Sequence, residues 1–362
     1  MTAPARVIDL RDETVGLEAF IVIDHELFPV SAGGTRMLPD VSVDEVARLA
    51  RAMTWKFAVC RVRYAGAKAG VRFAGGDRAT VWEAYRRAVD PLRDFFLTGP
   101  DMGTSPADFV PDGADDVPLW AKEYEGLGMD DLATGHGVKA AAEAALQSFG
   151  RELGGATVVI EGFGKVGAGT ARACAHAGAR VIGVSTVQGL LVDPDGLDVE
   201  GLIELRSQYG DRLVEHGSVS AHPREELFEL ECDVLVPGAR PDSVTDAVAE
   251  RLQCALVSPG ANAPYTAGAL EVLHRRGILA LPDFVSNSGG VHLYESLEQS
   301  DDPATALLKI ENLVAESITR LLAVADAEGL TPMAAAFREA RDFLQEETDA
   351  SEKKLAELFP LA

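Results

Sequence analysis

The second half of the chain alternates apolar runs with helical segments, and this alternation constrains the fold more than any other feature. An apolar run at 156–162 is followed by a helical segment at 165–178 and a second apolar run at 180–185. The pattern continues with apolar runs at 232–239, 254–262 and 278–287, separated by helical segments near 243–252 and 266–276. Continuous apolar strands that alternate with helices are typical of a parallel sheet buried on both faces. We therefore predict an α/β fold with a doubly wound domain over residues 133–300.

A glycine motif lies at the first strand-to-helix junction of this domain. Gly162, Gly164 and Gly167 form a Gly-x-Gly-x-x-Gly pattern. The first glycine permits a tight turn, the second lets the backbone approach a pyrophosphate, and the third allows close packing of helix on strand. The helix N-terminus stabilises the phosphate charge. In this context the motif predicts a Rossmann-type dinucleotide site rather than a glycine-rich turn without a ligand, with cofactor-binding residues Gly162, Gly164, Lys165, Val166 and Gly167.

The second strand of this unit ends at Ser185 and Thr186. A site specific for NAD usually carries Asp or Glu here, to bind the ribose 2′-hydroxyl. This chain has neither, and no arginine follows at once to receive the 2′-phosphate of NADP. Ser185 and Thr186 are therefore candidate cofactor residues, and the choice between NAD and NADP stays open.

The first part of the chain has a different pattern. Up to about residue 73, short apolar runs alternate with turns, which predicts strands. Ser42 stands three residues before Glu45, a capping-box spacing at the start of a predicted helix that reaches Cys60. Further helices are expected at 79–96, at 138–149, and from 303 to the end with a break near Gly329 and Pro332. We expect a substrate domain over 1–132, the dinucleotide domain over 133–300, and helices over 301–362 that pack back across the cleft.

Composition excludes several classes of function. The chain has 362 residues, with 33 Lys and Arg against 57 Asp and Glu, a formal charge of −24. Such an acidic chain repels phosphate backbones and anionic lipids, so nucleic acid and membrane surfaces are not expected partners. No apolar run reaches the roughly 18 residues needed to span a bilayer, and the N-terminus lacks a secretory pattern, so we expect a cytoplasmic protein. The four cysteines form no CxxC pair, which suggests neither a disulfide framework nor a zinc site.

Three charged residues in the first part of the chain have a functional and a structural interpretation. Lys56 lies on the apolar face of the predicted helix, where it either meets an anion or extends its ammonium to water. Lys68 lies among small residues that let a ligand approach, so it is either an acid–base group or a solvated turn lysine. Asp101 precedes a Met-Gly turn, which is its structural interpretation.

Eight short motifs in a fixed order narrow these alternatives. They are Gly33-Gly34-Thr35-Arg36-Met37, Met53-Thr54-Trp55-Lys56, Gly66-Ala67-Lys68-Ala69-Gly70, Asp101-Met102-Gly103-Thr104, Ala133-Thr134-Gly135-His136-Gly137-Val138, the loop at 161–167, Gly260-Ala261-Asn262, and the run from Pro282 to Val291. From about residue 20 to about 345, the chain closely resembles the glutamate/leucine/phenylalanine/valine dehydrogenase family.

The resemblance implies a function and assigns roles to residues. It implies reversible oxidative deamination of an L-α-amino acid to a 2-oxo acid and ammonia, with a nicotinamide cofactor, in a cleft between domains of a homo-oligomer. By similarity, Lys56 binds the substrate α-carboxylate, Lys68 activates the attacking water, and Asp101 exchanges protons with the substrate nitrogen and the water. The resemblance also implies further cofactor residues, namely Thr134, Gly238, Ala239, Asn262 and Asn287, the last lying between cofactor and substrate.

The pattern departs from the glutamate-specific relatives at two positions. Those relatives carry a lysine immediately before the Gly-Gly-x-Arg run, where this chain has Ala32, and a serine after the Gly-Gly-Val segment, where it has Tyr294. A buried distal carboxylate without a cationic partner is strongly unfavourable. We therefore expect an apolar or aromatic amino acid and a place nearer the leucine and phenylalanine enzymes, with substrate-binding residues Lys56, Gly34, Ala32, Asn287, Val291 and Tyr294.

Two other classes of protein remain as alternatives. One is a nucleotide-binding regulatory protein that has the fold without turnover. Such a protein needs none of the three residues Lys56, Lys68 and Asp101. The other is a 2-hydroxy-acid dehydrogenase, whose chemistry usually relies on a histidine–carboxylate pair rather than on lysines.

Overall fold

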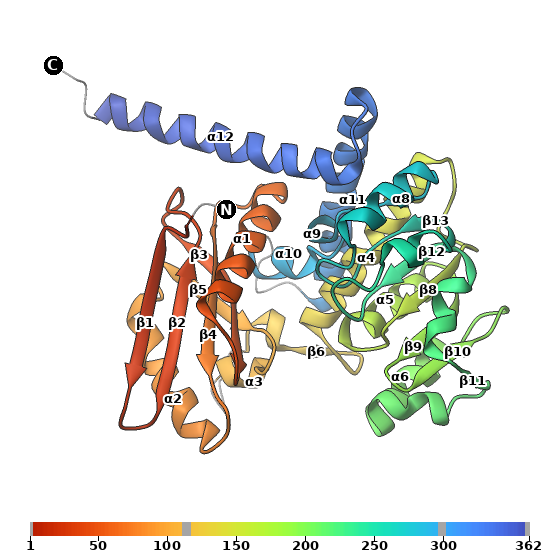
Figure 1. The fold of residues 1–362 in the computed structure, drawn as a ribbon, viewed down its shortest axis with the longest axis horizontal. Helices are drawn as coiled ribbons and strands as arrows, with labels where there is room; N and C mark the ends of the chain where they lie inside the picture. The colour runs from red at the N-terminus through yellow and green to blue at the C-terminus, as the bar shows by residue number, and fades with distance from the viewer. Residues whose placement is uncertain (1–2, 111–116, 296–301, 359–362) are drawn as a thin grey trace. The chain divides into compact units, whose positions relative to one another are not determined.

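The computed structural model describes residues 3–110, 117–295 and 302–358 (Figure 1). The chain forms two compact units, one of Met1–Val117 with Phe337–Ala362 and one of Pro118–Ala336. Each contains its own sheet covered by helices, as expected for the α/β class. In the described part of the chain, no helix combines the length and the apolar character that a membrane span requires.

The first unit is built on a five-stranded sheet with the strand order β1-β2-β4-β3-β5. These strands are β1 (Arg6–Asp12), β2 (Leu17–Ile23), β3 (Ser31–Leu38), β4 (Ala65–Arg72) and β5 (Phe96–Pro100). β1 and β4 pair antiparallel with β2, whereas β3 pairs in parallel with both β4 and β5. β3 is therefore the strand that separates β4 from β5.

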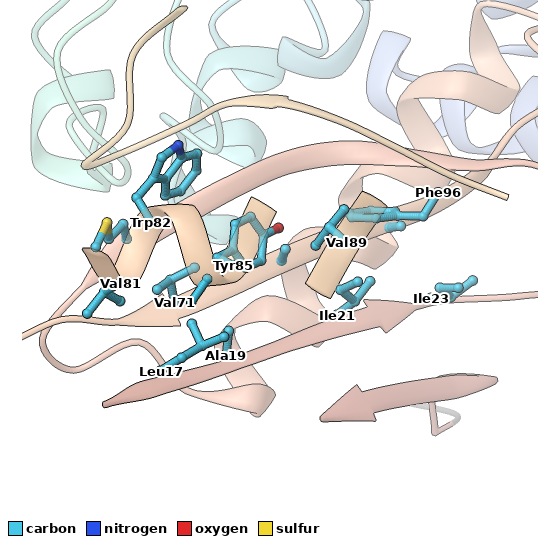
Figure 2. Close-up of a cluster of buried hydrophobic side chains, with 14 of the residues drawn as sticks. Leu17, Ala19, Ile21, Ile23, Val71, Val81, Trp82, Tyr85, Val89 and Phe96 are labelled. Carbon is cyan, nitrogen blue, oxygen red and sulfur yellow. The ribbon is translucent and has the colours of Figure 1, made fainter. Parts of the chain in front are cut away.

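Each face of this sheet is covered by one helix, because alternate residues of a strand point to opposite faces. On one face, α2 (Arg78–Val89) packs through Trp82 and Tyr85 on the side chains of β2 and on Phe96 (Figure 2). On the other face, α1 (Val43–Val59) packs through Val46 and Ala50 on the remaining side chains of β2. Burial on both faces explains why β2 is almost wholly apolar.

The predicted N-terminal helices are present with shifted ends. Ser42 caps α1 as expected, since its hydroxyl accepts a hydrogen bond from the Glu45 backbone N–H. The helix expected at 79–96 ends at Val89, because Pro91 lacks a backbone N–H and its ring clashes with a continuing helix. The chain then forms the short helix η1 (Asp90–Leu92) before β5, and α3 (Pro106–Phe109) follows.

The second unit is built on a seven-stranded sheet with the order β11-β10-β9-β8-β12-β13-β14. Its strands are β8 (Thr157–Glu161), β9 (Arg180–Thr186), β10 (Gly189–Val192), β11 (Ala221–His222), β12 (Glu231–Pro237), β13 (Gln253–Val257) and β14 (Leu279–Ala280). The five strands from β9 to β14 along this order are parallel, and β10 and β11 add an antiparallel edge. After β8, the chain adds β9, β10 and β11 on one side of it and then returns to add β12, β13 and β14 on the other side. The strand order therefore reverses next to β8. In open α/β sheets, ligands bind at such a reversal, outside the carboxyl ends of the strands.

The remaining elements surround this sheet or follow it. They are η2 (Leu119–Ala121), the hairpin of β6 (Glu123–Tyr124) and β7 (Leu127–Gly128), α4 (Met129–Ser148), α5 (Lys165–His176), α6 (Val199–Tyr209), η3 (Gly210–Glu215), η4 (Arg224–Glu229), α7 (Asp246–Ala249), α8 (Ala267–Arg275), α9 (Asp283–Ser286), α10 (Gly289–Glu295), α11 (Pro303–Glu328) and α12 (Pro332–Leu358).

The division of the chain differs from the expected boundaries at 132/133 and 300/301. α4 begins at Met129 rather than at 138 and packs on α5 and α11, so the whole helix belongs to the second unit. The helices expected to form one segment over 301–362 are split between the units at Phe337. Gly329, in the left-handed conformation, ends α11 at the predicted break.

The strand expected at 278–287 is shorter than the prediction. β14 covers Leu279–Ala280, and α9 begins directly after Pro282. Pro282 is the N-cap residue of α9 and has no backbone N–H, so it cannot donate to the ladder of a longer strand. The apolar run was therefore a short strand followed by a buried helix, which periodicity does not distinguish from one longer strand.

Candidate active site

In the first unit, Lys68 and Asp101 meet across strand β3 of the sheet. Lys68 lies on β4 and Asp101 directly follows β5, while β3 runs between these two strands. The Lys68 ammonium Nζ lies 3.1 Å from the Asp101 carboxylate oxygen Oδ2, and both side chains are largely buried. Two residues far apart in the sequence thus form one ion pair.

Gly34 on β3 makes this contact sterically feasible. A Cβ atom added at Gly34 would lie 2.9 Å from the Pro100 carbonyl oxygen, 3.0 Å from the Asp101 Cβ and 3.2 Å from the Lys68 Nζ. The backbone of Pro100 could not yield to such an atom without moving β5. Because the two charged side chains meet directly over β3, the strand needs a glycine at this position.

Arg36 holds the Asp101 carboxylate from the other side. The Arg36 Nε donates to Asp101 Oδ2 at 3.1 Å, and its Nη1 donates to Glu45 of α1. Burial by itself raises the pKa of the Asp101 carboxyl, but the charges of Lys68 and Arg36 outweigh it and hold this pKa below its usual range. Asp101 is therefore an ionised carboxylate at neutral pH.

The turn after Asp101 is fixed by hydrogen bonds. The Asp101 backbone N–H donates to the Thr104 hydroxyl, which itself donates to the Thr35 carbonyl oxygen of β3. Gly103 has a φ of +80°, and a Cβ there would lie 2.0 Å from the Met37 carbonyl oxygen. The Asp-Met-Gly-Thr motif is therefore a turn, as its composition indicated. Its hydrogen bonds to β3 also fix the position of the Asp101 carboxylate.

Arg36 belongs to the Gly33–Met37 motif, but the sequence analysis assigned it no function in the site. Alternation along β3 was the available signal, because residues two apart share a face. Ala32, Gly34 and Arg36 accordingly lie on the same face of the sheet. Ala32 is buried and pairs with Gly66 of β4 and Leu97 of β5.

Lys56 lies on the helix that covers this same face. A Cβ at Gly66 would lie 2.2 Å from the Ala50 carbonyl oxygen and 2.4 Å from the Thr54 hydroxyl oxygen, so α1 packs directly over β4. Lys68 shares the face of Gly66, and Lys56 stands half-buried in the last turn of α1. The structure brings Lys68, Asp101 and Gly34 into contact and places Lys56 on the helix above them.

In the second unit, the glycine loop has the geometry that the motif requires. Gly162 has a φ of +87°, and its N–H donates to the Ser185 hydroxyl. A Cβ at Gly167 would lie 1.9 Å from the Gly162 carbonyl oxygen, so α5 closes tightly on the loop. A Cβ at Gly164 would meet nothing within 4 Å, so the backbone before α5 faces open space. These features fit a dinucleotide pyrophosphate at the N-terminus of α5, next to the exposed Lys165.

Other candidate cofactor residues gather around this loop, at the reversal of strand order. A Cβ at Gly162 would lie 3.0 Å from Ala239, and one at Gly238 would lie 2.8 Å from the Glu161 carbonyl oxygen. The next loop also approaches, since a Cβ at Gly260 would lie 3.2 Å from a methyl group of Val166. The loops after β8, β12 and β13 are therefore neighbours.

Two candidate asparagines are joined in this second unit. The Asn287 Nδ2 donates to the Asn262 Oδ1 at 2.9 Å and to the Gly260 carbonyl oxygen at 3.3 Å. This hydrogen bond links the loop after β13 to the residue that ends α9. Each side chain therefore restricts the orientation of the other, and a fixed orientation suits a group that binds a ligand.

Ser185 and Thr186 are placed differently from the expectation of a direct cofactor contact. Both are buried. The Thr186 hydroxyl donates to the Asp211 carbonyl oxygen and accepts from the Gln188 N–H, and the Ser185 hydroxyl supports the glycine loop. In this structure both residues stabilise the loop region from within, and neither side chain presents a charge that separates NAD from NADP.

The remaining candidate cofactor and substrate residues, Thr134, Val291 and Tyr294, lie on α4 and α10, which pack on each other. The Thr134 hydroxyl donates to the Asp130 carbonyl oxygen, and a Cβ at Gly290 would lie 3.5 Å from this hydroxyl oxygen. Val291 is buried. The Tyr294 ring stacks on Trp120, with 5.3 Å between ring centroids. The expected substrate residues are thus divided, with Lys56, Gly34 and Ala32 in the first unit and Asn287, Val291 and Tyr294 in the second.

The structure also shows a charged network in the second unit that the sequence did not indicate. The His136 Nδ1 lies 2.6 Å from Glu311 Oε1, and the Lys139 Nζ donates to Glu311 and Glu143. These contacts join α4 to α11. Among the described residues, no group of three or more His, Cys, Asp or Glu is arranged to hold a metal ion.

Comparison with known families agrees with this geometry. The family model described as Glutamate/Leucine/Phenylalanine/Valine dehydrogenase matches residues 126–338. A second model, described as Glu/Leu/Phe/Val dehydrogenase, dimerisation domain, matches residues 4–110. The chain belongs to the glutamate/leucine/phenylalanine/valine dehydrogenase family.

Individual relatives are glutamate dehydrogenases. The chain is 33% identical over 278 residues to the NADP-specific glutamate dehydrogenase of Saccharolobus shibatae, an alignment that covers 72% of this chain and 65% of the relative. It is 31% identical over 288 residues to the catabolic NAD-specific glutamate dehydrogenase RocG of Bacillus subtilis, with the same coverage of 72% and 65%. The chain thus spans slightly less than two thirds of the length of these two relatives.

A solved structure supports the fold over nearly the whole chain. The hetero-hexameric glutamate dehydrogenase from Thermus thermophilus, in its Leu-bound form, matches with a TM-score of 0.79 and 25% identity, covering 96% of this chain and 90% of that one. The names of these proteins do not support the expected place nearer the leucine and phenylalanine enzymes.

Proposed function

We propose that this protein is an NAD(P)-dependent amino-acid dehydrogenase, which converts an L-α-amino acid reversibly to its 2-oxo acid and ammonia. The observation that carries the proposal is the contact of Lys68 with Asp101 at 3.1 Å over Gly34. An ammonium and a carboxylate in one largely buried pair are suited to proton transfer. A binding protein without turnover needs no such pair.

The roles follow from the charges of the groups. Lys56 is a half-buried residue of α1, the helix that covers this face of the sheet, and its positive charge binds the substrate α-carboxylate. Asp101 is ionised, so its Oδ2 accepts the proton that the substrate ammonium loses. The Lys68 Nζ lies within hydrogen-bond distance of this oxygen and relays the proton to and from the attacking water. Arg36 and Thr104 orient Asp101 and do not touch the substrate in this scheme.

The second unit holds the cofactor in this proposal. Residues 162–167 bind the pyrophosphate at the N-terminus of α5, and Thr134, Asn262 and Asn287 lie toward the nicotinamide. The bound nicotinamide supplies the hydride acceptor. The two relatives described above are NADP-specific and NAD-specific by name, and the end of β9 carries no acidic side chain, so the proposal includes both cofactors.

For the side chain of the substrate, we propose an apolar or aromatic group. Ala32 is buried on the face of the sheet that carries Lys68, and it supplies no cation for a distal carboxylate. The names of the relatives favour glutamate instead. A direct assay decides between these two substrates.

The experiment mixes the pure full-length chain with NAD or NADP and a panel of L-amino acids, including glutamate, leucine and phenylalanine, and follows absorbance of the reduced cofactor. We expect turnover with an apolar or aromatic amino acid at a kcat/KM at least about tenfold above that for glutamate. A preference for glutamate would refute the substrate proposal and leave the activity proposal intact. Cofactor binding without turnover of any amino acid would favour the regulatory alternative.

A labelled substrate separates the proposal from the hydroxy-acid alternative. Deuterium is placed on the Cα of the preferred amino acid or of its 2-hydroxy analogue. We expect deuterium to appear in the reduced cofactor from the amino acid alone. Transfer from the hydroxy acid would replace our proposal with the alternative.

Ala32 offers a test of the substrate pocket. Ala32→Lys should raise kcat/KM for glutamate relative to the apolar substrate by about tenfold, because it supplies a cation for the distal carboxylate. Ala32→Met, of similar length but uncharged, is the control and should not produce this shift. Equal behaviour of two folded variants would place Ala32 outside the pocket.

We also propose that identical subunits associate in the cytoplasm. The match of residues 4–110 to a dimerisation domain supports association. Light scattering after size exclusion tests it, and a monomer at micromolar concentration would refute it.

A further inference from the structure

Two cysteines that lie 22 positions apart in the sequence are direct neighbours in the sheet of the second unit. Cys232 on β12 and Cys254 on β13 are register partners in a parallel pair. Adjacent strands lie about 4.8 Å apart, and side chains at paired positions point to the same face. Disulfides usually join Cα atoms about 4.4–6.8 Å apart, so this spacing suits a bond between the two sulfur atoms.

The surroundings of the pair also place the two thiols together. Both side chains belong to the same hydrophobic cluster, and both line one shallow cavity of about 380 Å³ together with Arg151, Gln253 and Arg276. Cys232 is buried, whereas Cys254 is partly exposed. A small reagent entering the cavity therefore meets Cys254 first.

Arg276 lies beside the more accessible thiol. Its guanidinium donates to the carbonyl oxygens of Ala249 and Leu252, which hold it at the cavity. Burial raises the pKa of the Cys254 thiol to about 12, and the charge of Arg276 opposes this rise. The thiolate of Cys254 thus has a nearby cation, although burial keeps its population small at neutral pH.

We propose that Cys232 and Cys254 form a reversible cross-strand disulfide by exchange with low-molecular-weight disulfides, which makes this cavity a redox modification site. The Cys254 thiolate attacks one sulfur of the small disulfide, whose S–S bond breaks and releases one thiolate. Cys232 then loses its proton to solvent and attacks the Cys254 sulfur, which releases the second thiolate. Two protein thiols are oxidised, one small disulfide is reduced to two thiols, and two electrons are transferred.

The other two cysteines make the site selective. Cys60 is the C-terminal cap of α1 in the first unit, and Cys174 is buried in α5. Neither is a register partner of another cysteine within the described residues. The expected bond links β12 and β13, which lead at their carboxyl ends to the loops with Gly238 and Gly260.

The test uses the wild-type full-length chain, incubated with oxidised glutathione at about pH 7 and about pH 9, then alkylated and analysed by mass spectrometry. We expect a decrease of about 2 Da before alkylation, two fewer alkyl groups after it, and one cross-linked peptide pair containing Cys232 and Cys254. The reaction should be faster at the higher pH, because it needs the thiolate. The bond closes a loop of the unfolded chain, so Tm should rise by about 5 °C and return on reduction.

Two variants check the order of the steps. Cys232→Ser retains the accessible thiol and should accumulate the mixed disulfide with glutathione, whereas Cys254→Ser should not. Retention of all four thiols at both pH values would overturn the proposal, as would a bond to Cys60 or Cys174. These readouts do not depend on enzyme activity, so they remain informative if the proposed function fails.

Discussion

Replacing Asp101 with asparagine is the sharpest test of the candidate site. The substitution keeps the shape of the side chain and one acceptor oxygen but removes the charge. In the structure, Asp101 Oδ2 lies 3.1 Å from both Lys68 Nζ and Arg36 Nε. The variant therefore leaves two largely buried cations without their shared carboxylate.

The size of the effect follows from these distances. At 3.1 Å and an effective dielectric constant of about 20, each attraction amounts to about 5 kcal/mol. Most of this is offset by the cost of desolvating the ions, and removing one partner of a buried pair usually costs about 3–5 kcal/mol. Because asparagine still accepts a hydrogen bond and the Asp101 side chain is 18% exposed, we expect a loss of about 2–3 kcal/mol in the free energy of unfolding.

The loss should depend on pH in a defined direction. The pKa of Asp101 is lower in the folded state than in the unfolded chain, so its contribution to stability is present above the unfolded value of about 3.9. This contribution disappears as the pH falls through the folded value. The difference between wild type and Asp101→Asn should therefore be constant near neutral pH and shrink in acid.

The assay combines thermal unfolding, followed by circular dichroism across pH, with amino-acid-dependent reduction of the cofactor. Loss of proton transfer should lower kcat/KM by about 10²–10⁴-fold. Asp9→Asn is the matched control, since Asp9 lies on β1 with 64% of its side chain exposed, and it should change neither Tm nor activity. Undiminished activity in a folded Asp101→Asn variant would refute the proton-transfer role, and a difference in Tm that persists in strong acid would refute the electrostatic reasoning.

Three further predictions concern other parts of the molecule. Lys68→Ala should lower kcat/KM by about 10²–10⁴-fold while cofactor affinity, measured by fluorescence titration, stays within about twofold; equal loss of both would indicate a structural residue. Gly167→Ala should lower both Tm and cofactor affinity, because its Cβ would lie 1.9 Å from the Gly162 carbonyl oxygen. Gly164→Ala should weaken cofactor binding at unchanged Tm, because a Cβ there would meet no protein atom within 4 Å. Unchanged cofactor affinity in Gly164→Ala would argue against a pyrophosphate at this loop. Glu311→Gln should lower stability by about 1–3 kcal/mol at neutral pH, because hydrogen bonds and charge from His136 and Lys139 outweigh burial and lower the pKa of Glu311. The difference from wild type should shrink in acid, with exposed Glu316→Gln as the control, and a difference that does not change with pH would contradict this origin.

Several features of the molecule could be predicted from local sequence because their cause is local. A glycine is needed where φ is positive or where helix and strand backbones nearly touch, and Gly162 and Gly167 meet these two conditions. The alternation of apolar runs and helices indicated the parallel sheet of the second unit. The order of the motifs singled out Lys68 and Asp101 before their contact was visible.

The ends of elements were less predictable, because they depend on competition between local signals and packing. α4 begins nine residues before the expected start at 138, since glycines in its first half let α5 and α10 approach closely. The sequence of α4 contains these glycines but does not identify the helices that approach them, which are α5 and α10.

Only the tertiary structure decided which distant residues are neighbours. β3 lies between β4 and β5, so Gly34 rather than another glycine passes beneath the Lys68–Asp101 contact, and Arg36 becomes the second cation on the carboxylate. The pairing of Cys232 with Cys254 likewise depends on the register of β12 and β13. Periodicity states which residues of a strand share a face, but the order and register of strands come from long-range hydrogen bonding and burial, and these exist only in the folded chain.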